Sequence, residues 1–218
     1  MILYGSSMSP FVRKVLAFAG EKGIELDLQR AGAGFRDPDP AFVAASPFRK
    51  MPALVDDDYR LADSSAIIQY LEAKYPEPAL IPVDPQDRGR VIWFEEFADT
   101  ILTACGAKMF FNRIVSPVFL KQPGDLGAAD KAQQEELPPI LDYLETVAPE
   151  SDGHLVGNQL TLADIAVASP FANLQHLGCD IDRGRYPRTS AFVERTLGRP
   201  SFATWIDREK AALAKLAG

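Results

Sequence analysis

The sequence predicts an α/β domain followed by an all-α domain, with a proline-rich linker between them. Strand signals occur only near the beginning of the chain, where they alternate with helical patterns in the order βαβ and then ββα. Prolines crowd the stretch 76–85, which therefore cannot be a regular helix or a central strand. Only helical patterns follow it. We expect the α/β domain over residues 1–76, the linker over 77–86 and a helical bundle over 87–218.

The βαβ unit is predicted from apolar spacing and from the positions of glycine and proline. Residues 1–4 form a short apolar run that suits a buried strand. Ser9 and Pro10 are typical of an N-cap and a first helical position. Apolar residues then recur with helical spacing up to Gly23, which suits a helix end, at Val12, Val15, Leu16 and Ala19. Residues 24–29 alternate between apolar and polar, so a second strand, parallel to the first, is expected.

The second half of the α/β domain is expected to be a loop, a hairpin and a helix. Residues 31–50 are rich in Gly, Asp and Pro and predict a loop with one helical turn near Phe42. The runs 53–55 and 59–61 flank a polar turn at residues 56–58 and predict a β-hairpin. Asp63 is then the expected N-cap of a helix that ends before residue 76 and buries Ile67, Ile68 and Leu71.

The all-α domain is predicted as five helices. The expected ranges are 90–114, 131–147 with a bend at Pro138-Pro139, 162–174, 190–197 and 201–216. The stretch Thr161-Leu162-Ala163-Asp164 has the form of a capping box, with Asp in place of the usual Glu, so the third of these helices should begin there.

Composition excludes several classes of function. The net charge of -7 argues against nucleic acid and anionic membrane surfaces as partners, since both require clustered Lys and Arg. No signal peptide is recognised, and no apolar run approaches the ~20 residues that span a bilayer. Cys105 and Cys179 are far apart and outside any CxxC spacing, so neither a disulfide framework nor a metal site is expected. These features predict a cytoplasmic protein.

Four segments together resemble the soluble glutathione transferase family. They are Leu3-Tyr4-Gly5 with Ser9–Val15 and Glu21–Ile24, then Lys50–Leu54, then Asp63–Leu71, and finally Leu160–Ala166. Their order and spacing match a serine-type member, theta-, delta- or zeta-like and bacterial in style, over nearly the whole chain. The resemblance implies a thioredoxin-like N-terminal domain that binds glutathione as co-substrate. It also implies a helical domain that supplies the pocket for a small-molecule electrophile, and a homodimer.

The resemblance implies that Ser9 is the catalytic residue. The nucleophile in this chemistry is a thiolate, and a free thiol has a pKa near ~8.5. Lowering that pKa by about 2 units takes about 2.7 kcal/mol. A hydroxyl hydrogen bond to the anion supplies about 1.5–3 kcal/mol, and a helix N-terminus adds about 0.3–1. Ser9 could instead only cap its helix, and Ser6, Ser7 and Tyr4 are weaker candidates for the hydroxyl.

The resemblance assigns glutathione binding to Lys50, Met51, Pro52, Asp63 and Ser64. A cis Met51-Pro52 bond would turn the backbone of residue 51 outward to pair with the peptide of glutathione, as in strand addition. Pro52 could also merely start an edge strand. Ser64 would hold the γ-glutamyl carboxylate at a helix N-terminus, and Asp63 the ammonium. Most family members have Glu at this position, so a water could bridge the shorter Asp63, or Asp63 could be simply the N-cap.

The electrophile pocket is expected to include Met8, Phe11, Phe110 and Arg113. An aromatic cluster such as Met109-Phe110-Phe111 can also be ordinary core. Arg13 and Lys14 could join salt bridges, but solvated positions are the expectation. His154 is expected in a loop near Gly153 and Gly157, and His176 at a helix end, both without a role.

Two other enzyme classes are disfavoured by missing residues. Disulfide exchange needs a cysteine at the first helix, and that stretch reads Ser9-Pro10-Phe11-Val12. A serine hydrolase would need a GxSxG elbow with a histidine base, and no such elbow occurs. Glutathione conjugation is the leading hypothesis. The alternatives are a glutathione-dependent isomerase, dehalogenase or ether-cleaving enzyme, and a non-catalytic binding or regulatory protein on the same fold.

Overall fold

The computed structural model describes residues 1–34 and 37–217 and divides into two compact units. The first unit comprises Met1–Leu80 and Pro200–Glu209, and the second comprises Ile81–Arg199 and Lys210–Gly218. Residues 35 and 36 of the expected 31–50 loop lie outside the described residues.

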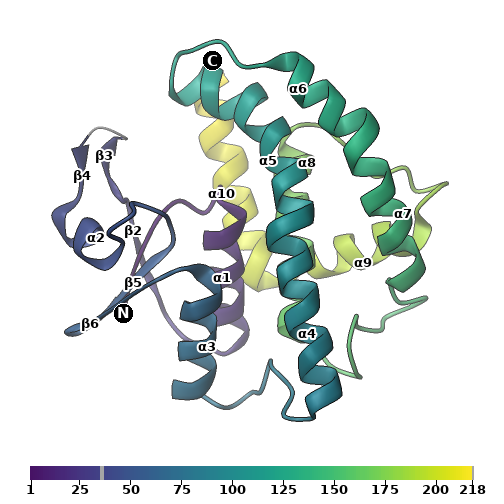
Figure 1. Cartoon of the computed structure of the whole chain (residues 1–218), viewed down its shortest axis with the longest axis horizontal. Coiled ribbons are helices and arrows are strands. Elements are labelled where there is room, and N and C mark those ends of the chain that lie inside the picture. Colours follow the sequence, from purple (N-terminus) through teal and green to yellow (C-terminus); the bar gives the residue numbers. More distant parts are fainter. Residues whose placement is uncertain (35–36, 218) are drawn as a thin grey trace. The chain divides into compact units, whose positions relative to one another are not determined.

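The first unit contains a four-stranded sheet in the order β2-β1-β5-β6 (Figure 1). The strands are β1 (Ile2–Tyr4), β2 (Asp27–Gln29), β5 (Ala53–Asp56) and β6 (Tyr59–Ala62). β1 pairs in parallel with β2 and antiparallel with β5, and β5 forms a hairpin with β6. The predicted βαβ unit and hairpin are therefore confirmed. The second strand is shorter than predicted, and the hairpin turn is narrower because Asp56 belongs to β5.

Helices cover both faces of this sheet. Helices α1 (Pro10–Glu21) and α3 (Ser64–Lys74) lie side by side on one face, and α2 (Pro40–Ala45) lies on the other (Figure 1). Successive side chains of a strand point to opposite faces, so Tyr4 packs with Phe42 and Ala45 of α2 while Leu3 is fully buried on the α1 side. The predicted apolar faces of α1 and α3 are buried, as expected.

The stretch expected as a loop has more structure than its composition suggested. The helical turn near Phe42 is confirmed as α2, which Asp39 caps by accepting the N–H of Ala41 at 2.7 Å. Before it, β3 (Gly32–Gly34) and β4 (Asp37–Pro38) form a separate two-stranded antiparallel pair. Strands this short and this rich in Gly and Pro have no apolar alternation, so the pattern analysis could not detect them.

Arg13 and Lys14 correct an expectation, because both are buried rather than solvated. The Arg13 guanidinium pairs with the carboxylate of Glu209, with Nη2 at 2.7 Å from Oε2 and Nε at 3.2 Å from Oε1. Glu209 belongs to α10 (Pro200–Ala217), whose residues 200–209 join the first unit. Glu209 lies 196 residues after Arg13 in the sequence, so local periodicity could not predict that α10 buries this face of α1.

The helices of the second unit are longer than predicted. The expected 90–114 helix runs without interruption from α4 (Pro85–Phe97) through η1 (Ala98–Leu102) and α5 (Thr103–Phe110) to η2 (Phe111–Phe119). The expected 131–147 helix begins at α6 (Leu126–Lys131) and continues through η3 (Ala132–Glu136) into α7 (Leu137–Val147). The bend predicted at Pro138-Pro139 stays a prediction; the π-helical η3 segment lies just before these prolines, which stand in the first turn of α7, where a missing N–H donor costs little.

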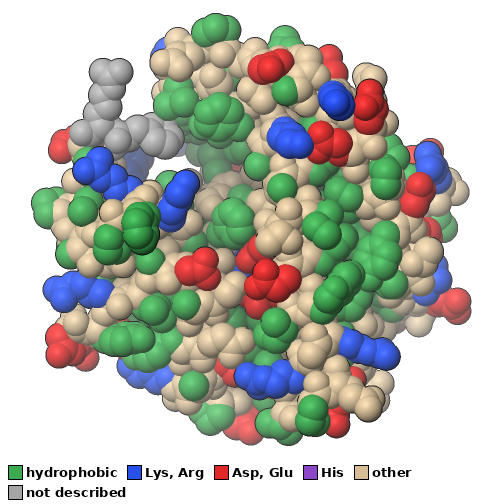
Figure 2. Space-filling view, in the orientation of Figure 1, with side chains coloured by type: hydrophobic (Ala, Val, Ile, Leu, Met, Phe, Trp, Pro, Cys, Tyr) green, Lys and Arg blue, Asp and Glu red, His purple; other side chains and the backbone are tan. Residues whose placement is uncertain are grey.

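The other helices of the second unit are α8 (Leu162–His176) and α9 (Pro187–Leu197), and α10 ends the chain. His176 is the last residue of α8, as predicted. Hydrophobic side chains gather on the surface over α4 and α7 (Figure 2). There Trp93 stacks on Phe97 with ring centroids 5.5 Å apart, and it meets Tyr143 edge-on at 5.6 Å.

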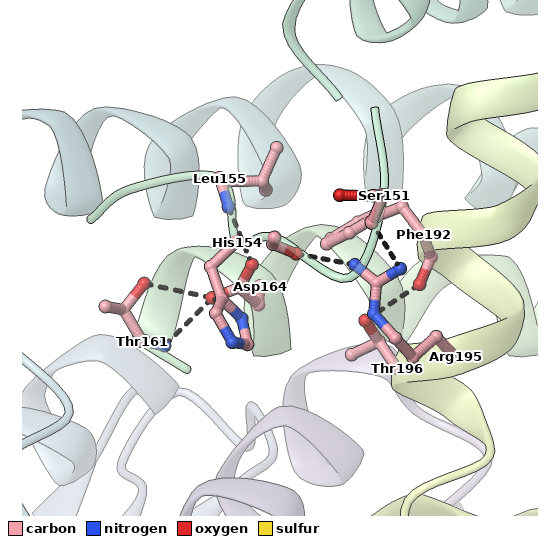
Figure 3. A network of polar contacts seen from close by, with 9 residues as sticks. Ser151, His154, Leu155, Thr161, Asp164, Phe192, Arg195 and Thr196 are labelled. Atoms are coloured by element: carbon pink, nitrogen blue, oxygen red, sulfur yellow. Dashed lines mark hydrogen bonds and ion pairs between the residues drawn. The ribbon is translucent and has the colours of Figure 1, made fainter. Parts of the chain in front are cut away.

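A buried polar network anchors the start of α8 (Figure 3). The carboxylate of Asp164 is fully buried and accepts the N–H groups of Leu155 and Thr161, each at 2.9 Å. His154 lies in the expected loop with Nδ1 3.5 Å from Asp164 Oδ2. Arg195 holds the preceding loop by donating to the carbonyl oxygens of Ser151 and Gly153. The predicted capping box is confirmed.

Candidate functional site

One row of paired residues brings three separate chain segments to the same edge of the sheet. Gln29 pairs with Tyr4, Tyr4 with Ala53, and Ala53 with Ala62. Neighbouring strands are about 4.8 Å apart. The segment after β1, the segment before β5 and the segment after β6 therefore meet at this edge. These segments carry Ser9, Met51-Pro52 and Asp63-Ser64 respectively. The strand register therefore brings residues that are far apart in the sequence to one edge of the sheet.

Ser9 is the N-cap residue of α1, and its hydroxyl is not used for capping. Its backbone is extended, with φ -76° and ψ 125°, and its side chain makes no capping hydrogen bond. The backbone is nevertheless fixed, because the Ser9 N–H donates to Ser6 O at 2.9 Å and the Ser9 carbonyl accepts the Arg13 N–H at 2.9 Å. The side chain is partly buried. A hydroxyl held in this way at a helix N-terminus can donate to an anion.

Gly5 sets the distance between β1 and α1, and the motif analysis gave it no functional role. A Cβ on Gly5 would lie 2.6 Å from Cγ2 of Val12 and 3.6 Å from Cβ of Met51. The first distance is too short for a real Cβ, whereas the second is an ordinary van der Waals contact, so Val12 of α1 is the group that excludes a side chain at Gly5. A glycine directly after a buried strand and before a serine-rich loop is the sequence signal for such an approach.

The Met51-Pro52 peptide bond is cis, which confirms that prediction. Pro52 is buried, Met51 is partly buried against the α2 side of the sheet, and Lys50 is exposed. Ser46, which sequence reasoning missed, shapes the approach: its Oγ accepts the Lys50 N–H at 3.0 Å and donates to Lys50 O at 2.7 Å. The segment is therefore held on both sides of Lys50, and residue 51 lies beside the row of strands, where an extended peptide can pair with it.

Asp63 caps α3, so its simpler predicted role is confirmed. Its Oδ1 accepts the N–H groups of Ser65 at 2.9 Å and Ala66 at 3.3 Å. Its backbone has φ 82°, a left-handed conformation that costs a non-glycine residue about 1–3 kcal/mol. Ser64, the first residue of α3, is only 2 % exposed. The second carboxylate oxygen of Asp63 and the N-terminal end of α3 are the charged and polar groups at this corner.

The competing hydroxyl groups differ in position from Ser9. Tyr4 is 5 % exposed and its ring lies 6.1 Å from that of Phe42 on the α2 side of the sheet. Burial, with help from Asp39 and Asp27, raises the pKa of its phenol, so it stays protonated. Ser6 is exposed and Ser7 partly buried on the loop before α1. Met8 and Phe11, which flank Ser9, are both partly buried.

Phe110 and Arg113 lie in the second unit, in α5 and η2. Phe110 is 7 % exposed and so belongs largely to the core of that unit. Arg113 donates to Gln133 Oε1 at 2.6 Å and to Asp130 Oδ1 at 2.8 Å. Its Nη1 is also 3.6 Å from Sγ of Cys179. Arg113 therefore ties η2 to the stretch 130–133 and to the segment after α8.

The described residues contain neither a metal-ligand cluster nor a membrane-spanning helix. Among the described residues, no cluster of three His, Cys, Asp or Glu side chains could ligate a metal ion. Likewise, none of the helices formed by these residues is long and apolar enough to cross a membrane.

The fold and the site together define a class of protein. A four-stranded mixed sheet with a cis-proline before β5 and two helix N-termini at one edge is a thioredoxin-like domain, and here a helical domain follows it. Residues 3–79 match the glutathione S-transferase N-terminal domain, and residues 110–209 match the C-terminal domain.

Individual relatives agree with these family matches. The chain is 32% identical to glutathione S-transferase theta-3 of Mus musculus over 88% of its length and 80% of that protein. It is 29% identical to theta-1 of Homo sapiens over 98% of its length and 83% of that protein. Among solved structures, glutathione transferase E6 of Drosophila melanogaster superposes with a TM-score of 0.78 at 28% identity, covering 99% of this chain and 96% of that one. The chain therefore belongs to the soluble glutathione transferases, enzymes that use glutathione as co-substrate.

Proposed function

We propose that this enzyme ionises glutathione through Ser9 and adds the thiolate to an electrophilic, largely apolar small molecule. The observation that carries the proposal is the unused hydroxyl of Ser9 at the start of α1, at the sheet edge shared by Met51-Pro52 and Asp63-Ser64. Lowering a thiol pKa from ~8.5 to ~6.5 takes about 2.7 kcal/mol. One hydroxyl hydrogen bond to the anion, about 1.5–3 kcal/mol, together with the helix N-terminus, about 0.3–1 kcal/mol, is sufficient.

In this proposal the backbone and side chains around the row hold the rest of glutathione. The N–H and C=O of Met51 pair with the peptide of glutathione. Lys50 directly precedes Met51 and would meet the glycine carboxylate of glutathione. Ser64 and the N-terminal end of α3 hold the γ-glutamyl carboxylate. The Asp63 carboxylate, which already caps α3, takes the ammonium with its remaining lone pairs or through a water. Residues 1–76 thus supply the glutathione site.

Four residues are proposed as candidates for contact with the second substrate. Met8 and Phe11 flank Ser9, and Phe110 and Arg113 come from the helical domain, residues 87–218 beyond the 77–86 linker. Arg113 donates to Gln133 and Asp130 and is therefore held in place, and its remaining N–H groups could orient a polar substituent. Phe110 is largely core, so of these four residues Met8 and Phe11 are the stronger candidates.

The ultraviolet absorbance of bound thiolate against pH tests the role of Ser9. We expect the wild type to bind glutathione as thiolate well below the free-thiol pKa. Ser9→Ala should still bind glutathione, but with a thiol pKa raised by about 1–2 units, the equivalent of one lost charge-assisted hydrogen bond. Ser7→Ala, on the same loop, is the matched control and should titrate like the wild type. If Ser9→Ala and Ser7→Ala both titrate like the wild type, Ser9 is not the activating group.

The outcome for the wild type decides between enzyme classes. Glutathione bound only as thiol, or not bound, would favour a non-catalytic binding or regulatory protein. Glutathione ionised but never consumed would favour an isomerase or another reaction that regenerates it. Product analysis with aryl halide, alkyl halide and aryl ether substrates then separates conjugation from dehalogenation and ether cleavage, which begin with the same thiolate.

Asp63→Asn tests the ammonium contact separately from the cap. Asn keeps an acceptor oxygen for the Ser65 and Ala66 N–H groups but removes the charge. We expect stability to change by less than about 0.5 kcal/mol while the KM for glutathione rises about threefold to tenfold, the effect of one partly solvated ion pair. Deaminated glutathione, which lacks the ammonium, should bind both forms equally. Equal KM values for ordinary glutathione would assign Asp63 to capping alone.

A cytoplasmic homodimer is also proposed. Large apolar side chains are exposed in both units, among them Phe48 at 87 % and Trp93 at 49 %, and such side chains favour contact with a second copy. Light scattering should give twice the chain mass of 23.9 kDa. A monomer at micromolar concentration would contradict this part of the proposal.

A further inference from the structure

The second unit contains a double cavity that is built entirely from its own residues. The larger part has a volume of about 340 Å³ and lies between α8, α9 and the segment 179–183. The smaller part has about 200 Å³ and lies between α7, the end of α8 and the segment 179–186. Leu174, Cys179, Asp180 and Ile181 line both parts, so the two adjoin. The larger part alone falls within the ~300–1,000 Å³ range of small-molecule pockets.

The larger cavity has an apolar wall. Phe171, Leu174 and Val193 are each no more than 2 % exposed, so their side chains are fixed by the surrounding core. Ile181, which is partly exposed, faces them from the 179–183 segment. This apolar wall therefore suits the face of one or two fused rings.

The charges around the cavity are unequal. Arg183 is paired with Glu194 at 2.5 Å and Arg185 with Asp142 at 2.8 Å, so both cations that line the double cavity are already neutralised. Asp182 caps its own turn by accepting the N–H of Gly184 at 2.8 Å. Asp180 lines both parts of the cavity and makes no hydrogen bond or ion pair with the described residues. A ligand with a positive charge meets an available carboxylate there, whereas an anion is repelled.

A second polar group stands in the wall of the larger part. Ser190 lines it and is 5 % exposed, and its Oγ has no hydrogen-bond partner among the described residues. An unpaired buried hydroxyl is destabilising, and a ligand or water that pairs with it recovers part of the lost hydrogen-bond energy. Rotation about one bond is all that a serine needs to turn its hydroxyl toward the cavity.

We propose that this double cavity binds a small aromatic amine, separately from the glutathione site. The ring system packs against Phe171, Leu174, Val193 and Ile181, the ammonium pairs with Asp180, and Ser190 offers a further hydrogen bond. The inference does not depend on Ser9 or on glutathione chemistry.

Three naphthalene derivatives with one ring system and different charges test the proposal. They are 2-naphthylmethylamine, 2-naphthalenemethanol and 2-naphthoate, with binding followed by fluorescence anisotropy. S-hexylglutathione is present in saturating amounts, so that the catalytic site of the family is filled. We expect one molecule of the amine to bind per chain, about threefold more tightly than the alcohol, as one solvated ion pair allows, with the carboxylate weakest.

Two variants and one control locate the binding. Asp180→Asn should remove the preference for the amine over the alcohol, and Asp152→Asn, an exposed loop control, should preserve it. Ile181→Trp should fill the cavity and weaken both ligands at least tenfold; because Ile181 is partly exposed, the fold should tolerate it. The proposal is overturned if no probe binds while S-hexylglutathione is bound, if Ile181→Trp leaves the affinity unchanged, or if the carboxylate binds best.

Discussion

The starts of α1 and α8 carry the same kind of residue and use it in opposite ways. Ser9 and Thr161 are both N-cap residues with extended backbones, at φ -76° and ψ 125° and at φ -130° and ψ 172°. Three residues later α8 has Asp164, whose buried carboxylate accepts the Thr161 N–H at 2.9 Å and its hydroxyl at 3.2 Å. At the same position α1 has Val12, which has no acceptor, and the Ser9 hydroxyl makes no capping bond.

The difference shows how a helix start can serve stability or chemistry. At α8 the Asp164 carboxylate and the Thr161 hydroxyl are paired inside the protein, so the site is a structural anchor. At α1, Pro10 removes one of the N–H donors that a cap would have to satisfy, and the hydroxyl stays available. The cost of an absent cap is about 1 kcal/mol, which the packing of α1 against α3 and residues 200–209 can offset. Mutations at the two helix starts should therefore have opposite profiles.

Asp164→Ala should give the largest loss of stability. It leaves the buried N–H groups of Leu155 and Thr161 without an acceptor, and such changes cost about 3–5 kcal/mol. The free energy of unfolding from urea denaturation measures this loss. Asp152→Ala, on the exposed loop nearby, is the control and should change stability by less than about 0.5 kcal/mol. A loss below about 1 kcal/mol for Asp164→Ala would mean that water replaces the carboxylate and that the α8 start is not an anchor.

The start of α8 could be predicted fully from the sequence, whereas the start of α1 could be predicted only in part. A Thr followed three residues later by an acid is a local pattern with one structural meaning, so the α8 capping box was predicted and is confirmed. Ser9 before Pro10 predicts where α1 begins, but whether the hydroxyl caps the helix depends on its side-chain rotamer. The order of strands and the cis Met51-Pro52 bond were also predicted, the latter through family resemblance.

What could not be predicted depends on contacts between distant parts of the chain. Arg13 is buried because Glu209, 196 residues away, accepts its guanidinium. Gly5 is constrained by the Val12 side chain of α1, and Ser46 shapes the Lys50 backbone from an earlier turn. The first long helix exceeds its predicted end at residue 114 because the π-helical segment η2 continues through Pro117, a residue type that periodicity treats as a break.

Gly5→Ala should have the next largest effect and would disturb the α1 start without touching Ser9. The added Cβ would lie 2.6 Å from Val12 Cγ2, and a β-branched side chain cannot move aside easily. Overpacking of this kind costs about 1–3 kcal/mol. Thermal unfolding measures the loss, and glutathione ionisation should weaken with it because α1 is displaced. Combined with Val12→Ala, the change should cost less than the sum of the two single changes; additivity would show that the two groups do not collide.

Glu145→Gln should cost less and should be pH-dependent. Glu145 caps α9 from α7, accepting the N–H groups of Arg188 and Thr189, each at 2.9 Å. Burial acts to raise its pKa, but these bonds and the Thr189 hydroxyl outweigh burial, so the pKa falls below the ordinary 4.5. A lowered folded-state pKa gives stability that is present above pH 4.5 and is lost as the pH falls through the folded value. We expect a loss of about 1 kcal/mol at pH 7.

The measurement for Glu145 is the difference in unfolding free energy between the wild type and Glu145→Gln, from pH 7 down to pH 3. The difference should shrink below pH 4.5, because the wild type loses the same charge that the variant lacks. Glu150→Gln, an exposed residue on the following loop, should give no such trend. A difference that stays constant with pH would mean that the charge of the Glu145 carboxylate does not contribute to stability at the α9 start.

Ser9→Ala should have the smallest effect on stability, and it is the sharpest test of the comparison. Because the Ser9 hydroxyl makes no capping bond, its removal should change the free energy of unfolding by less than about 0.5 kcal/mol. Thr161→Ala is the matched change at the other helix start and should cost about 1–2 kcal/mol, since it removes a hydroxyl from a closed capping box. Both are measured by urea denaturation without ligand. If Ser9→Ala costs as much as Thr161→Ala, the oxygen of Ser9 accepts a helix N–H in solution, and the same hydroxyl must then donate its hydrogen to the thiolate while it caps α1.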